Sequence, residues 1–223
     1  MRGLAAQNAM KYKRNVEIFA GWGFFVTLLS FCLVVTLGCT SVRTPMKPGS
    51  PGSLKPDEGL VLGRIQLMGS NGERFASPNQ PFRSPFHIQW RLKDASAGKE
   101  FVIDRLPRAE PFVVKLPAGS YQLTAVSFDT ALGIWQATLP ANFTVNPRGC
   151  TYLGTWELRM NAGFFDGFVS RRVIDQRSVA ESDLKPFIED GVRPPMIAQL
   201  GPAEESPLIL TFRTQGTDLT SPP

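Results

Sequence analysis

Residues 112–126, FVVKLPAGSYQLTAV, contain the turn on which the predicted fold class depends. After PAGS, apolar and polar residues alternate, which is the period of a β-strand with one buried face. Pro117 presets the backbone angle that a turn requires, and Gly119 accepts a positive φ. We therefore predict a β-hairpin from Phe112 to Phe128.

The same alternation continues outward, in LVLGRIQLM (60–68) and PFHIQWRL (85–92). The residues expected to face inward there are Val61, Ile65, Leu67, Phe86, Ile88, Trp90 and Leu92. Further strands are expected in EFVIDRL, IWQATL, NFTV, CTYLGTWELRM, GFVSRRVIDQ and PLILTFRT, with Gly154 at a bulge or a close approach. About nine short strands separated by turn signals predict an all-β fold, an antiparallel β-sandwich.

One short helix is expected near the C-terminal part of the chain. Ser182 is suited to cap DLKPFIEDG, Pro186 falls near the first turn, and Gly191 is a stop signal.

The N-terminus has the order of an export signal. A basic front, Arg2–Arg14, precedes an almost purely apolar run, Ile18–Gly38. A run of about twenty residues is also long enough to span a bilayer, so an uncleaved helix is the alternative. The compact basic start at Met10 leaves open whether translation begins at Met1 or at Met10.

The residues TLGC, 36–39, resemble the lipobox of bacterial lipoproteins, and Gly38 and Cys39 match it, whereas Thr36 stands where the family usually has leucine. The resemblance implies a lipoprotein signal peptide at 1–38 and a lipid anchor (palmitate or a related acyl chain) on Cys39. Acyl chains hold a protein at a membrane because each buried methylene contributes about 0.8 kcal/mol. Thr40, after the cysteine, implies the outer membrane, facing the periplasm.

A flexible tether rich in Pro, Gly and Ser is expected at 39–58, with a reach of about 25 Å. The β-sandwich domain follows at 59–214, and a disordered tail at 215–223.

Two short motifs, LPxGxY and YLG, resemble the transthyretin-like or carboxypeptidase-regulatory-like sandwiches of uncharacterised bacterial lipoproteins. The matching residues are Leu116, Pro117, Gly119 and Tyr121, followed by Tyr152, Leu153 and Gly154. The resemblance implies a transthyretin-like, immunoglobulin-like fold in the cell envelope, and it brings no catalytic residues.

The charge distribution argues against a nucleic-acid partner. Of the formal net charge of +5, residues 1–38 contribute +3, because they contain four basic residues and one acidic residue. The rest of the chain is only +2 and has no stripe of Lys and Arg for a phosphate backbone.

Catalytic chemistry is sparse in this sequence. The single histidine, His87, is expected to face outward. Because the chain has no second histidine to accompany it, we expect neither a metal site nor a Ser-His-Asp triad. Once Cys32 leaves with the signal and Cys39 carries lipid, Cys150 has no partner for a disulfide, and we expect it to be buried. We expect no metal, no cofactor and no enzymatic activity.

A carboxylate-dependent, carbohydrate-active enzyme is the alternative, because two carboxylates about 5 to 9 Å apart can cleave a glycosidic bond. The scattered candidates are Asp104, Glu110, Asp129, Glu157, Asp166 and Asp175.

The segment NAGFFDGF contains three phenylalanines, Phe164, Phe165 and Phe168. Adjacent Phe164 and Phe165 cannot both face inward on a regular strand, so an exposed aromatic group is a candidate partner contact. The alternative is a loop folded over the core. The sequence thus predicts a membrane-anchored envelope lipoprotein with a binding or assembly role, or else an accessory subunit held by an uncleaved N-terminal helix.

Overall fold

The computed structural model describes residues 40–50, 53–69, 72, 87–130, 133–162, 167–189, 194–201 and 207–213. The chain divides into two units, Met1–Cys39 and Thr40–Pro223, and all described residues belong to the second. The expected signal peptide, Cys39, Phe164, Phe165 and the expected tail at 215–223 lie outside the described residues.

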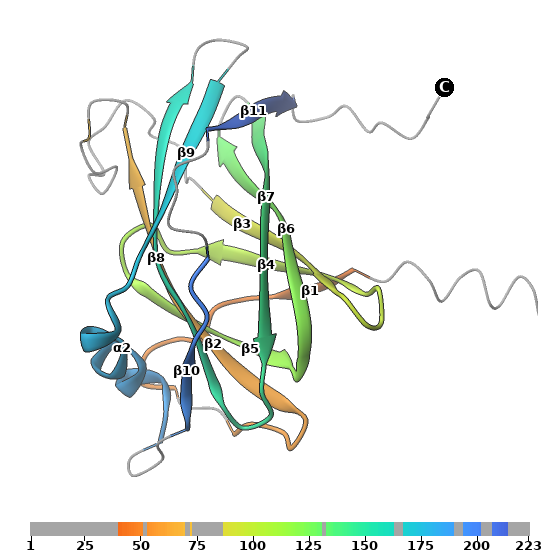
Figure 1. The fold of residues 1–223 in the computed structure, drawn as a ribbon, viewed down its shortest axis with the longest axis vertical. Helices are drawn as coiled ribbons and strands as arrows, with labels where there is room; N and C mark the ends of the chain where they lie inside the picture. Colours follow the sequence, from red (N-terminus) through yellow and green to blue (C-terminus); the bar gives the residue numbers. More distant parts are fainter. Residues whose placement is uncertain are drawn as a thin grey trace, which may run out of the picture. The chain divides into compact units, whose positions relative to one another are not determined.

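The described residues are mostly β-strand, with one α-helix and one 3-10 turn (Figure 1). The elements are β1 Ser41–Arg43, β2 Glu58–Met68, β3 His87–Asp94, β4 Glu100–Leu106, β5 Pro111–Pro117, β6 Gly119–Thr130, β7 Gly133–Val145, β8 Cys150–Ala162, β9 Gly167–Ile174, α2 Arg177–Leu184, η1 Lys185–Phe187, β10 Met196–Ala198 and β11 Leu208–Arg213. For the described residues, the prediction of a mostly β fold with one short helix is confirmed.

All the strands belong to one 11-stranded sheet, in the order β1-β4-β3-β6-β7-β11-β9-β8-β2-β5, with β10 beside β8. Most neighbours are antiparallel, but β1 with β4, β2 with β8, and β10 with β8 are parallel. Strand β11 joins the two halves of the sheet, because its first three residues pair with β9 and its last three with β7.

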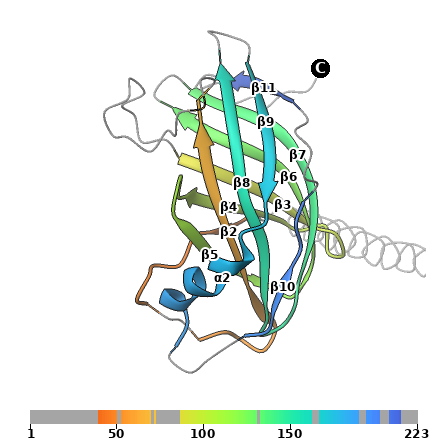
Figure 2. The same ribbon diagram turned by 60° about the vertical axis from the view of Figure 1, so that its left-hand side comes forward.

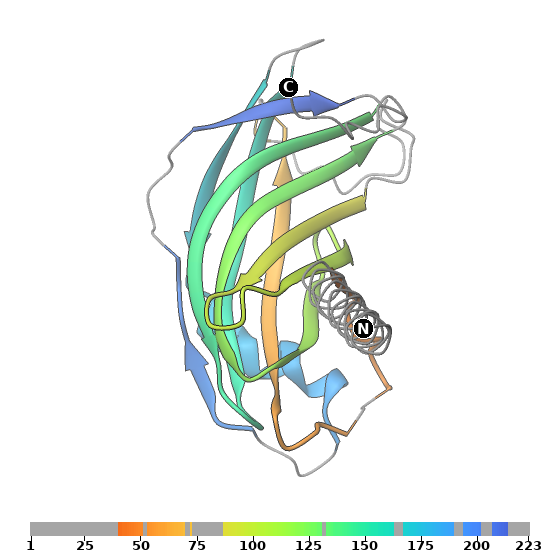
Figure 3. The ribbon, with the colours of Figure 1, turned by 90° about the vertical axis from the view of Figure 1, so that its right-hand side faces the viewer.

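The sheet curves so strongly that its two halves share one core (Figure 3). Trp90 on β3 and Trp156 on β8 have ring centroids 5.1 Å apart, although four strands separate them in the sheet order. Trp90 also meets Phe112 on β5 edge to face, at 5.3 Å. These aromatic contacts hold the two halves together over the concave face.

The inward faces predicted from alternation are confirmed. Of the seven residues expected inside, six are buried in this core, and Phe86 lies outside the described residues. Strand β2 is buried on both faces over its first half, because Leu60 and Leu62 point away from the shared core into a second cluster. Helix α2 and the η1 turn cover that second cluster on the outer face of β2, β5 and β8 (Figure 2).

The predicted hairpin from Phe112 to Phe128 is wrong. Strand β5 pairs with β2, whereas β6 pairs with β3 and β7. Only Ala118 lies between β5 and β6, so the chain turns a corner from one half of the sheet into the other. The hydroxyl of Tyr121 donates to the carbonyl oxygen of Pro117 at 2.8 Å and holds this corner, and Gly119 does not have the positive φ that we expected.

The bulge predicted at Gly154 is confirmed. Between Leu62 and Arg64, the single residue of β2 faces two residues of β8, and Gly154 has φ +84°. The two strands expected in IWQATL and NFTV form one strand, β7. Pro140 fits within β7 because the pairing with β6 skips there, at an irregularity between Leu123 and Ala125.

The predicted helix is displaced along the chain. Helix α2 ends at Leu184, so Ser182 lies in its last turn instead of capping its first, and its hydroxyl bonds Val179 O at 2.7 Å. Pro186 lies in the η1 turn that follows, because proline has no N–H to continue an α-helix.

The segment expected to be a free tether, 39–58, follows the sheet where it is described. Ser41–Arg43 form β1 on the edge of β4, and Met46 N–H then donates to Val113 O on β5 at 2.8 Å. Gly49 N–H donates to Pro186 O at 2.7 Å, and Met46 and Leu54 pack against the second cluster. These contacts correct the tether prediction for the described residues of this segment.

Candidate binding surface

Phe168 and Ile209 form an exposed apolar pair on the outer face of the sheet. Phe168 on β9 is 44% exposed, and Ile209 on β11 is 79% exposed. The register places them directly opposite each other across the β9–β11 pairing, where Cβ atoms lie about 4.5 to 5.5 Å apart. Among the large exposed apolar side chains that the structure describes, these two are paired with each other by register.

The alternation of both strands keeps this pair outside. In β9, Val169, Arg171 and Val173 are buried, so Phe168 necessarily points to the opposite face. In β11, buried Leu210 has the same effect on Ile209. To bury either side chain, its strand would have to slip by one residue and expose the whole inward set.

Polar residues border the pair along β8 and β9. Asn161 on β8 is opposite Phe168, the next outward-facing residues are Arg159 on β8 and Ser170 on β9, and Arg172 follows Ser170 on the same face. A guanidinium nitrogen of Arg159 lies 3.5 Å from a carboxylate oxygen of Glu157. An apolar centre with a polar, partly cationic border is the common anatomy of a protein interface.

Arg171, in contrast, is buried on the inner face of the sheet, behind the exposed pair. Its guanidinium points inward, lies 5.8 Å from the centre of the Trp156 ring, and donates to Pro140 O on β7 at 3.1 Å. Burial lowers the pKa of Arg171. This contact connects β9 to β7 on the inner side of β11.

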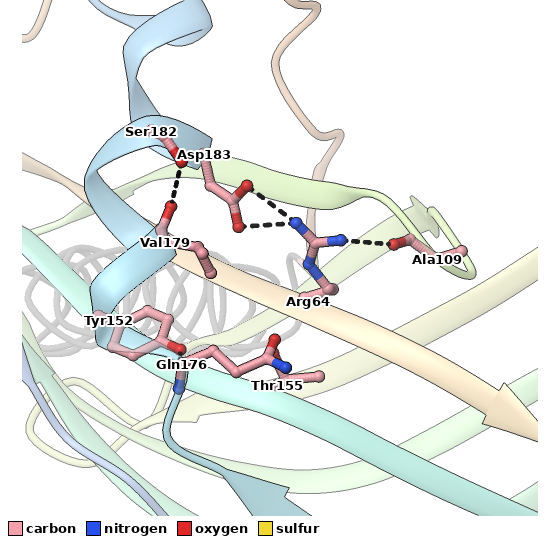
Figure 4. Close-up of polar contacts among 8 residues, drawn as sticks. All are labelled: Arg64, Ala109, Tyr152, Thr155, Gln176, Val179, Ser182 and Asp183. Atoms are coloured by element: carbon pink, nitrogen blue, oxygen red, sulfur yellow. Dashed lines mark hydrogen bonds and ion pairs between the residues drawn. The ribbon is translucent and has the colours of Figure 1, made fainter.

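A polar network fastens α2 to strands β2 and β8 of the sheet (Figure 4). Arg64 on β2 donates to both carboxylate oxygens of Asp183 at 2.8 Å and to Ala109 O at 3.1 Å. At the start of the helix, Gln176 N–H donates to the hydroxyl of Tyr152 at 2.9 Å, and Thr155 Oγ1 donates to Gln176 Oε1 at 2.8 Å.

This network gives α2 a structural role. Its apolar residues, Ala180 and Leu184, are buried against β2, β5 and β8. The helix therefore covers the outer face of β2, β5 and the first part of β8, whereas Phe168 is opposite Asn161, near the other end of β8.

The candidate catalytic residues are spread over different strands. His87 is half-buried at the start of β3, opposite Asp129 on β6. Asp104 accepts a hydrogen bond from Gln89 at 2.9 Å, and Asp175 accepts one from Arg177 N–H at 3.0 Å. Within the described ranges, three or more His, Cys, Asp or Glu side chains nowhere gather as metal ligands would.

The remaining carboxylates follow the same scattered placement: Glu157 pairs with Arg159, Glu110 is exposed before β5, and Asp166 lies outside the described residues. Cys150 is buried, as predicted, and burial raises the pKa of its thiol to about 12.

The structure places one of the predicted site residues. Phe168 is exposed on the sheet, whereas Phe164, Phe165 and Cys39 lie outside the described residues. Ile209 was not predicted as a contact. The alternation in LILTFR nevertheless places it on the outer face of the strand, because its neighbour Leu210 faces inward. Of the described helices, none has the length and apolarity needed to cross a membrane.

Comparison with known proteins identified no relative of this chain. No family model, curated protein or solved structure matches this chain. The lipobox and the sandwich motifs therefore remain resemblances, and the function has to be argued from the residues.

Proposed function

We propose that this chain is a bacterial envelope lipoprotein, anchored by acylation of Cys39 and facing the periplasm from the outer membrane, whose β-domain binds a protein partner and carries no catalytic site. The observation that carries the binding role is the exposed pair of Phe168 and Ile209, which face each other across the β9–β11 pairing. Aromatic and aliphatic side chains of this kind are frequent anchors at the centres of interfaces.

We assign the domain to the β-sandwiches of transthyretin-like or immunoglobulin-like type. Two observations support this assignment. The two halves of the sheet pack their inner faces on one core, as sandwich sheets do. The Tyr121 hydroxyl bonds a carbonyl four residues upstream at a strand corner, as the corner tyrosine of immunoglobulin-type domains does.

Crosslinking in native membranes tests the binding role. We expect wild type to give a crosslinked partner, identified by mass spectrometry, and the double variant Phe168→Ser/Ile209→Ser to lose it. The melting temperature should stay close to that of wild type, because both side chains are exposed.

Ile197→Ser is the matched control, because Ile197 is an exposed aliphatic residue (47%) on a different strand, β10. It should keep the partner. Retention of the partner in the double variant would contradict the proposal. A large drop in its melting temperature would also contradict it, and would show that the two side chains stabilise the core.

Acyl labelling tests the anchor. Cys39→Ala should abolish incorporation of a labelled fatty acid and leave a larger, unprocessed chain, whereas Cys32→Ala should change neither. If Cys39→Ala leaves size and labelling unchanged, the lipoprotein assignment fails and the uncleaved N-terminal helix takes its place.

A further inference from the structure

We propose that the folded unit lies directly on the membrane, with the turn between β3 and β4 (residues 95–99) against the lipid headgroups and the Phe168–Ile209 pair on the side away from them. The inference rests on the proposed acylation of Cys39. It adds a lipid-facing surface and an orientation that acylation alone does not give.

The first step is the length of the connection. Only Thr40 lies between Cys39 and Ser41, where β1 begins. Two Cα steps extend at most about 7 Å. An acylated Cys39 therefore holds the start of β1 within about one headgroup layer of the bilayer, instead of the 25 Å reach that a free tether would allow.

The second step is direction. Strand β1 runs parallel to β4, with Ser41 opposite Phe101. Thr40, the residue before Ser41, therefore lies on the Glu100 side of Phe101, toward the end of the turn. Residues 95–99 are all exposed, so the turn is free to meet a surface.

The third step is rigidity. The carboxylate of Asp94 accepts hydrogen bonds from the N–H groups of Ser96 and Ala97, at 2.8 and 3.0 Å, and from the hydroxyl of Ser96 at 2.6 Å. After β1, Met46 N–H donates to β5 and Gly49 N–H donates to η1. These bonds fix the chain that follows β1 to the rest of the domain. The acylated residue is thus joined to a strand whose position in the sheet is fixed.

The charges of this end do not select the orientation. Lys93 and Lys99 are balanced by Asp94 and Glu100. Because opposite charges cancel, electrostatic attraction to anionic lipids is small, and the covalent connection determines the contact. We therefore expect the orientation to be insensitive to salt.

The last step locates the exposed apolar pair. Ser120 O, at the start of β6, accepts a hydrogen bond from Ala95 in the turn, and Thr130, where β6 ends, is ten residues further on, about 33 Å along the strand at about 3.3 Å per residue. Strand β11 pairs with β7 where β7 meets the far end of β6. In Figure 1 the β3–β4 turn and β9 lie on opposite sides of the folded unit.

Fluorescence quenching in vesicles tests this orientation. The full-length, acylated protein is reconstituted into phosphatidylcholine vesicles that contain headgroup spin-labelled lipid, with a fluorophore on Ala97→Cys or on Thr211→Cys. Buried Cys150 stays unlabelled in both. Thr211 is the matched control, because it is an exposed strand residue on β11.

We expect quenching to be several-fold stronger at position 97 than at 211, in low and high salt alike. A flexible Gly/Ser insert of about 12 residues between Thr40 and Ser41, with a reach of about 20 Å, should remove the difference. Equal quenching in a protein that floats with the vesicles overturns the orientation but leaves the lipid anchor standing. Failure to float overturns the anchor, and the orientation with it.

Discussion

Gly154 has a backbone conformation that other residues rarely adopt, in a place without room for a side chain. Its φ is +84°, and an added Cβ would lie 2.9 Å from Leu200 Cδ2 and Val173 Cγ1, and 3.1 Å from Ile174 O. We expect Gly154→Ala to lower the free energy of unfolding by about 2 to 4 kcal/mol, measured by urea denaturation, because strain and overpacking add.

Gly98→Ala separates these two causes. Gly98 has a similar φ, +65°, but nothing lies within 4 Å of its added Cβ. Its substitution should cost only about 1 kcal/mol, from the backbone alone. Equal losses at both positions would show that crowding at the bulge contributes nothing.

Cys150 should be inert in the folded protein. Burial raises the pKa of its thiol from 9.0 to about 12, and the thiolate is the reactive form. A thiol reagent at pH 8 should therefore label the native protein far more slowly than the urea-unfolded protein. Labelling at the unfolded rate would show that the thiol is accessible.

The same shift predicts how stability depends on pH. Since the folded thiol holds its proton more tightly than the unfolded thiol, its contribution to the free energy of unfolding is intact below pH 9 and falls as the pH rises toward 12. Between pH 9 and 10, the decline should be shallower in Cys150→Ala than in wild type.

The Arg64–Asp183 contact is one of the interactions that hold helix α2 on the sheet. Arg64 and Asp183 are joined by two hydrogen bonds at 2.8 Å, and their side chains are only 25% and 19% exposed. Asp183→Ala should lower the free energy of unfolding by about 1 to 2 kcal/mol, since Ala109 O is then the one acceptor left to the half-buried guanidinium within the described part of the chain.

Hydrogen exchange should show where this loss occurs, with faster exchange in Arg177–Phe187 than in the central strands. Glu181→Ala is the control, because it removes a carboxylate from an exposed position of the same helix. If both variants behave alike, helix charge accounts for the effect and the contact with Arg64 does not.

Alternation predicted the faces of the elements well but not their partners. Ile88, Trp90 and Leu92 point inward as expected, because the period of two is a local property of the chain. The pairing of β5 with β2, about fifty residues earlier in the chain, depends on which edges meet in the curved sheet. A turn motif such as PAGS cannot distinguish a hairpin from a corner between the two halves of the sheet.

The short helix was predicted in the right part of the chain, but its start was wrong for a related reason. Gln176 precedes α2 without a side-chain cap, and the N–H of Arg177 donates to the carboxylate of Asp175, which the sequence did not single out as a start, whereas Ser182 suggested a false one. Tertiary contacts of Ala180, Leu184 and Phe187 with the sheet determine where the helix lies. The candidate surface was half predicted, because Phe168 comes from β9 and its neighbour Ile209 comes from β11, forty residues later.

At the scale of the folded unit, β11 decides whether the two halves of the sheet behave as one. It pairs with both β7 and β9, and its Leu210, 2% exposed, joins the shared core. Because most of the buried aromatic residues belong to that one core, we expect a single cooperative unfolding transition.

Two neighbouring substitutions in β11 test this cooperativity. Leu210→Ala should lower the free energy of unfolding by about 2 to 4 kcal/mol, because it opens a cavity between the halves. Ile209→Ala, one residue away and 79% exposed, should change it by less than about 0.5 kcal/mol. In Leu210→Ala, far-UV circular dichroism and tryptophan fluorescence should still shift together, since Trp90 and Trp156 report on both halves at their contact. Separate transitions in the two signals would instead mean that β11 merely borders two independently stable halves.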